Sequence, residues 1–166
     1  MGKSSLIRRH QVGEFSETYT ATVGLDMKAT TFNFPSGSVI LTVVDIGGQE
    51  TFSGLRSRFF AGAHHIILVF DKTNRSTFDL IPEWHESLTK NVNIPDHLFP
   101  RGSLVGNKAD LEDAIQVTTE EAKRLAGILT LEYFDASAKT GLNVAEIFLH
   151  AASESRQLGK IISQSG

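Results

Sequence analysis

The stretch VILTVVDIGGQE, residues 39–50, joins an apolar, β-branched run to an acid, a glycine pair and a glutamine. The run Val39 to Asp45 predicts a strand. An acid at the carboxyl end of a strand can hold an Mg²⁺-bound water, and a glycine backbone can approach a phosphate without side-chain interference. A plain Gly-Gly turn is the alternative, and it explains the glycines but not Asp45.

Strand and helix patterns alternate on either side of this stretch. Residues 24–34 alternate apolar and polar side chains, and the turn at 35–38 predicts a hairpin with the strand that begins at Val39. Buried parallel strands are predicted over Ile66–Asp71, Gly102–Val105 and Leu131–Phe134. Helices are predicted over residues 4–12 and 78–88, and from capping patterns at Thr118 and Asn143. This order predicts an α/β fold with a doubly wound, mostly parallel sheet, one antiparallel edge hairpin strand and helices on both faces.

Composition favours one domain over residues 1–166, with 40% hydrophobic and 21% charged residues. A net charge of −3 gives no general attraction to nucleic acid. The chain has no cysteine, which excludes disulfides, thiolate catalysis and cysteine-linked lipid anchors on these residues. Without a signal-peptide core or a long apolar run, we expect a cytoplasmic protein.

Gly2-Lys3-Ser4 opens the first predicted helix. These residues match the last three positions of a phosphate-binding loop, in which backbone N–H groups and a lysine hold phosphates and a hydroxyl binds Mg²⁺. An ordinary basic helix start with a serine cap remains the alternative.

Asn107-Lys108-Ala109-Asp110 follows the strand that ends at Val105. A carboxylate there can accept two hydrogen bonds from guanine, a donor pattern that adenine lacks. Ser137-Ala138-Lys139 follows the last strand and is generic by itself, but its order and spacing suit a base-supporting loop. Four partial motifs thus occur in the order that a nucleotide pocket requires.

With these motifs, the chain resembles a Ras-superfamily small GTPase, and thus the P-loop NTPase type of fold. Asp45–Glu50, Asn107–Asp110 and Ser137–Lys139 match that family's signatures. Residues 15–26 resemble the first switch of Rab proteins, and Phe52, Phe60 and Gly62 suit the second. Asp45–Gln49 also resembles Arf proteins, so the second switch has some Arf-like character.

The resemblance implies a site for GTP or GDP with Mg²⁺. Lys3 would contact the β- and γ-phosphates, Gly48 would sense the γ-phosphate, and Gln49 would orient the attacking water. The implied catalytic residues are Gln49, Lys3 and Thr22. The implied metal ligands are Ser4, Thr22 and, through water, Asp45. Among Thr18, Thr20 and Thr22, the last is chosen because it directly precedes Val23-Gly24.

The resemblance also assigns the base. Phe15 and Lys108 would pack on its two faces, Asp110 would read guanine and the Ala138 amide would meet the guanine oxygen. Phe15 and Tyr19 could instead be loop-anchoring aromatics. The implied nucleotide-binding residues are Gly2, Lys3, Ser4, Ser5, Phe15, Tyr19, Thr22, Gly48, Asn107, Lys108, Asp110, Ser137, Ala138 and Lys139.

Both ends of the chain depart from the family pattern. The chain begins at Met1, without the expected first strand and the start of the phosphate loop, so we expect an N-terminally truncated G domain whose neighbouring strands lack a partner. A misplaced gene start is one hypothesis for this. At the other end, Ile161 to Gly166 offers no prenylation site, so we expect no lipid anchor and membrane recruitment only through adaptors.

The resulting expectation is a GTP-binding switch that hydrolyses GTP slowly and regulates partners, possibly in membrane traffic. Effectors, exchange factors and GTPase-activating proteins would bind residues 13–24 and 47–63. A pseudo-GTPase or scaffold with the same fold and weak nucleotide binding is the alternative. A P-loop ATPase is disfavoured by Asn107–Asp110.

Overall fold

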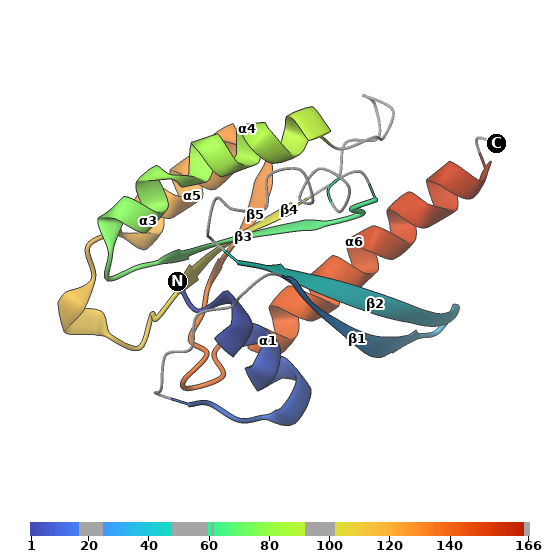
Figure 1. Cartoon of the computed structure of the whole chain (residues 1–166), viewed down its shortest axis with the longest axis horizontal. Helices are drawn as coiled ribbons and strands as arrows, with labels where there is room; N and C mark the ends of the chain where they lie inside the picture. Colours follow the sequence, from blue (N-terminus) through green and yellow to red (C-terminus); the bar gives the residue numbers. More distant parts are fainter. Residues whose placement is uncertain (17–24, 48–59, 61, 92–101, 165–166) are drawn as a thin grey trace.

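A computed structural model describes residues 1–16, 25–47, 60, 62–91 and 102–164. Figure 1 shows its helices and strands. In chain order they are α1 Lys3–Val12, β1 Leu25–Phe34, β2 Gly37–Ile46, β3 Ile66–Asp71, α3 Arg75–Asp79, α4 Ile81–Asn91, β4 Gly102–Asn107, a 3-10 turn Glu112–Ala114, α5 Thr119–Ile128, β5 Leu131–Asp135 and α6 Val144–Gln164. The predicted strands and their order are confirmed, and β4 runs on to Asn107.

The strands form two hydrogen-bonded groups. β1 and β2 pair antiparallel from Leu25 opposite Ile46 to Phe34 opposite Gly37, which confirms the predicted hairpin. β3, β4 and β5 form a parallel sheet in that order, with Ile66 opposite Gly102 and Gly102 opposite Leu131. The predicted single sheet is therefore divided, with β2 and β3 in different groups.

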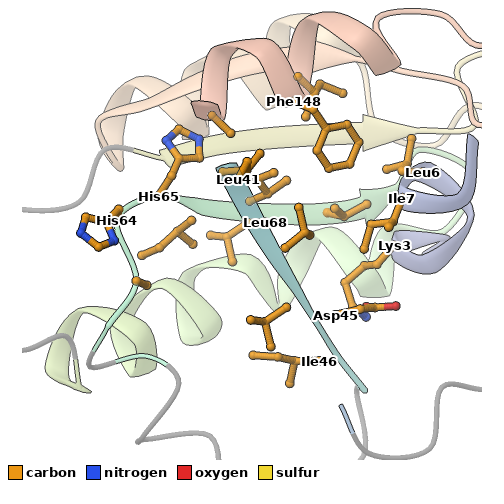
Figure 2. Close-up of a pocket in the computed structure, with 18 of the residues that line it drawn as sticks. Lys3, Leu6, Ile7, Leu41, Asp45, Ile46, His64, His65, Leu68 and Phe148 are labelled. Atoms are coloured by element: carbon orange, nitrogen blue, oxygen red, sulfur yellow. The ribbon is translucent and has the colours of Figure 1, made fainter. Parts of the chain in front are cut away.

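An apolar cavity of about 660 Å³ lies between the two groups of strands. Residues of β2 and β3 line it, together with Leu6 and Ile7 of α1 and Phe148 of α6 (Figure 2). Lys3 and Asp45 lie at one end of this cavity, and His64 and His65 lie at the other. Among the described residues, β2 and β3 line this cavity and belong to separate sheets.

Helices cover both faces of the parallel sheet, as predicted (Figure 1). Because side chains alternate along a strand, Leu68 and Phe70 pack with Phe78 and Ile81 on the side of α3, α4 and α5. Their neighbour Val69 packs on the opposite side, against residues of α1 and α6. These two clusters form the core and hold the carboxyl ends of the three strands in place.

The predicted helix over residues 78–88 is two helices, α3 and α4, which meet at Leu80. Pro82 explains the break, because proline has no N–H to donate into the preceding turn and is tolerated only in the first turn of a helix. The cap predicted at Thr118 is confirmed, since its side chain accepts a hydrogen bond from the Glu121 amide. Within the described ranges, no helix is long and apolar enough to cross a membrane.

Candidate functional site

Polar side chains gather at one edge of the fold, where the strands end. Asp71, Asn107 and Asp135 are the last residues of β3, β4 and β5. Asp45, near the end of β2, is buried. Since the carboxyl ends of parallel strands meet at the same edge, ligands bind there in α/β sheets. The start of α1 reaches the same edge, because the Met1 carbonyl oxygen accepts a hydrogen bond from Asn107.

Asn107 joins three of the predicted motifs. Its side chain is buried, its Nδ2 donates to the Met1 oxygen at 3.0 Å, and its Oδ1 accepts from the Ala138 amide at 3.2 Å. Gly2 has φ 86°, and a Cβ there would lie 2.4 Å from Asn107 Nδ2. Glycine is therefore required at this position both for its backbone conformation and for the close approach of Asn107.

Asp110 is held by the loop that follows β5. The Ser137 hydroxyl donates to Asp110 Oδ1 at 2.6 Å, and the Thr140 amide donates to the same Ser137 oxygen at 3.0 Å. The Ala109 amide donates to the Ala136 carbonyl oxygen at 2.9 Å. The two loops that were predicted to read and support a base thus form one hydrogen-bonded unit.

Lys108 has a left-handed backbone with φ 65° and pairs with Asp71, its Nζ lying 2.5 Å from Asp71 Oδ2. Asp71 Oδ1 also accepts from the Thr73 amide at 2.9 Å and from its hydroxyl at 2.6 Å. Burial alone raises the pKa of Asp71, but the hydrogen bonds from Lys108 and Thr73 outweigh it and hold the pKa below its usual range. Asp71 is a site residue that the motifs did not indicate; its signal was an acid at the end of a buried strand.

Ser4 and Asp45 come together although 41 positions separate them. The Ser4 hydroxyl donates to Asp45 Oδ2, while Asp45 Oδ1 is buried and has no hydrogen-bond partner among the described residues. A buried carboxylate oxygen without a partner is costly, and Mg²⁺ prefers oxygen ligands, often with one or two carboxylates and several waters. The two residues therefore fit Mg²⁺. No group of three or more His, Cys, Asp or Glu side chains suited to a metal occurs among the described residues.

Several predicted site residues are not described. Tyr19, Thr22, Gly48 and Gln49 lie outside the described residues. So do residues 17–24 and 48–59, which belong to the ranges 13–24 and 47–63 expected to bind partners. Phe15 is described and is 37% exposed. Ser5 follows Ser4 in α1, and Lys139 follows the buried Ala138.

Comparison with known proteins decides the family. A sequence model of the Ras family matches residues 1–157. The chain belongs to the Ras family. Its α/β fold, with the parallel sheet, the antiparallel hairpin and helices on both faces, agrees with this membership.

The similar proteins place this Ras-family chain near the Rab proteins. Ras-related protein Rab-1 of Theileria annulata is 38% identical over 148 residues, which are 89% of this chain and 66% of that relative. Ras-related protein Rab-13 of Rattus norvegicus is 35% identical over 93% of this chain and 74% of its own length. Ras-related protein SEC4 of Candida albicans is 34% identical over 92% of this chain and 71% of its own length. The chain is Rab-like and spans 66% of the length of Rab-1.

Proposed function

We propose that this Ras-family chain binds GTP or GDP with Mg²⁺ and works in the cytoplasm as a switch for partner proteins of membrane traffic, hydrolysing GTP slowly. The observation that carries this proposal is the position of Asn107. Its side chain contacts Met1 beside the start of α1 and the Ala138 amide in the loop after β5. One residue thereby links the proposed phosphate site to the proposed base site.

The phosphates would bind at the start of α1. Backbone N–H groups at a helix N-terminus and the Lys3 ammonium favour an anion there. Ser4, Asp45 and Thr22 would hold Mg²⁺, which would neutralise charge on the phosphate oxygens when bound. Gln49 would orient the attacking water, so that no covalent intermediate with the protein is needed.

The base would bind between the loops after β4 and β5. Asp110 would accept hydrogen bonds from guanine, and the Ser137 hydroxyl on its Oδ1 supports this by fixing the carboxylate in one orientation. The Ala138 amide would donate to the guanine oxygen and would then share its hydrogen between the base and Asn107. Lys108 and Phe15 would pack on the two faces of the ring.

Residues 13–24 and 47–63 would change between the GTP and GDP states, and effectors, exchange factors and activating proteins would bind there. We propose a slow intrinsic rate because no arginine of the chain is assigned to the transferred phosphate. An arginine supplied by an activating protein adds roughly 10³ to 10⁵ in rate in such enzymes.

The test of this proposal is single-turnover hydrolysis of GTP by the parent chain and by Gln49→Leu. The parent should hydrolyse GTP slowly, and the variant should bind GTP equally well but hydrolyse it more slowly still. Equal hydrolysis by both would remove Gln49 from its role. A folded parent that retains no GTP or GDP would contradict the switch and support a scaffold.

A further inference from the structure

An ion pair between a buried lysine and a part-buried aspartate joins the ends of β3 and β5, where the loops of the proposed base site begin. Lys72 directly follows β3, and its side chain is only 6% exposed. Its Nζ pairs with Asp135 Oδ1 at the end of β5 and donates to the Thr119 hydroxyl at 2.9 Å. Asp135 also accepts hydrogen bonds from the Thr119 and Tyr133 hydroxyls, each at 2.7 Å. These contacts therefore compensate the two charges for their loss of water.

The electrostatics agree with a charged pair. Burial alone raises the pKa of Asp135, but the hydrogen bonds from Lys72, Thr119 and Tyr133 outweigh it and lower the pKa. Burial, followed by the hydrogen bond to Asp135, raises the pKa of Tyr133, so its hydroxyl remains a donor. The carboxylate is thus held from several directions and cannot shift without losing these partners.

The backbone of Lys72 holds both ends of the loop between β4 and α5. Its amide donates to the Asn107 carbonyl oxygen at 3.0 Å, where the base-reading motif begins. Its carbonyl oxygen accepts from the amides of Gln116 and Val117 at 2.9 and 3.2 Å, where the loop ends. The loop that carries Asp110 is therefore attached to Lys72 at its start and at its end.

The side chain of Lys72 holds the second loop. Asp135 is the last residue of β5, and Ala136, Ser137 and Ala138 follow it directly. The Asp135 carbonyl oxygen accepts from the Asn143 side chain at 2.7 Å, where α6 begins. Through its ion pair with Asp135, Lys72 thus sets the position from which the loop 136–140 departs.

We infer that Lys72, paired with Asp135, is a positioning residue for guanine recognition: it fixes the distance between Asp110 and the Ala138 amide. This inference rests on the proposed function, because it concerns how that base site is held. Lys72 itself does not contact the base in this arrangement. The side chain would act through Asp135, whereas the contact with Asn107 is made by the Lys72 backbone and remains when the side chain is replaced.

The test compares the affinities for GDP and inosine diphosphate (IDP). The base of IDP lacks the exocyclic amino group that would donate a hydrogen bond to Asp110. Lys72→Met should reduce the preference for GDP over IDP by about tenfold, the scale of one hydrogen bond made in poor geometry. A merely structural role would weaken the binding of both nucleotides by the same factor and leave the ratio of their affinities unchanged. Lys90→Met, which removes a lysine from the exposed pair with Glu86, is the matched control and should leave the ratio unchanged.

A second variant guards against loss of folding, since Lys72→Met alone leaves the part-buried Asp135 carboxylate without its cation. The double substitution Lys72→Met with Asp135→Leu removes both charges and should fold, with the same reduced preference. An unchanged preference in the folded double variant would overturn the inference.

One readout separates this inference from the proposed function. Amide NMR signals of Ala109 and Ala138 in the nucleotide-free chain should shift in the double variant and not in Lys90→Met. A parent that binds no GDP would refute the proposed function, and these shifts would still decide whether Lys72 positions the two loops. Unshifted signals would overturn the inference whether or not GDP binds.

Discussion

Replacing Gly2 by alanine should destabilise the chain by more than its backbone strain alone. A non-glycine residue in the left-handed conformation costs about 1–2 kcal/mol, and Gly2 has φ 86°. The new Cβ would also lie 2.4 Å from Asn107 Nδ2 and displace that side chain. Asn107 would then lose its hydrogen bonds to Met1 and Ala138, which contribute about 0.5–1.5 kcal/mol each. We expect a loss of about 2–5 kcal/mol in the free energy of unfolding.

Gly13 provides a matched control for this prediction. It also has a left-handed backbone, with φ 70°, but a Cβ there would meet no atom of the described residues within 4 Å. Gly13→Ala should therefore cost only the strain, about 1–2 kcal/mol. Urea unfolding of the parent, Gly2→Ala and Gly13→Ala chains, monitored by circular dichroism, measures both losses of stability.

A double-mutant cycle isolates the contact itself. In an Asn107→Ala background the excess cost of Gly2→Ala over Gly13→Ala should disappear, because the displaced side chain is absent. Equal destabilisation by the two glycine substitutions in the parent chain would refute the reasoning that Asn107 closes on Gly2.

Three further predictions concern the base, the metal and pH. Asp110→Asn should shift preference from GDP toward XDP, because an amide replaces an acceptor with a donor; an unchanged preference in competition binding would contradict the assignment. Asp45→Asn should weaken Mg²⁺ binding by about 10- to 100-fold, measured as nucleotide retention during Mg²⁺ titrations. An unchanged Mg²⁺ midpoint would exclude Asp45 as a metal-binding residue. Burial, with His150 nearby, lowers the pKa of His65 from 6.5 to about 4. The unfolded chain therefore binds the proton more readily than the folded chain. Neutral His65 contributes fully to stability above pH 6.5, and the free energy of unfolding falls by roughly 3 kcal/mol at most as pH drops from 6.5 to 4. His65→Gln should reduce the dependence of the urea midpoint on pH between 6.5 and 4. An identical pH dependence in the parent and the variant would contradict this.

Strand positions could be predicted because each strand has a local signal. The run from Ile66 to Asp71 is apolar throughout, and β3 has these bounds. The break at Leu80 was not predicted, because the apolar spacing continues across it and only Pro82 marks the new helix. The division of the strands into two groups depends on long-range pairing, which a local sequence pattern does not predict.

The motifs of the site could be predicted, but the contacts that join them could not. Topology brings the ends of β4 and β5 together, which is why Asn107 and Ser137 were expected at one edge. The roles of Asp71 and Lys72 depend on partners more than 35 positions away, at Lys108 and Asp135. A local pattern carries no information about such pairs.

The most direct test of the proposed function is the nucleotide content of the purified chain, resolved by mass, before and after EDTA. Bound GDP or GTP that EDTA releases is the expected result, because Ser4 and Asp45 would hold the Mg²⁺ that retains the phosphates. A folded chain that contains no guanine nucleotide and takes up none from added GDP and Mg²⁺ would contradict the account.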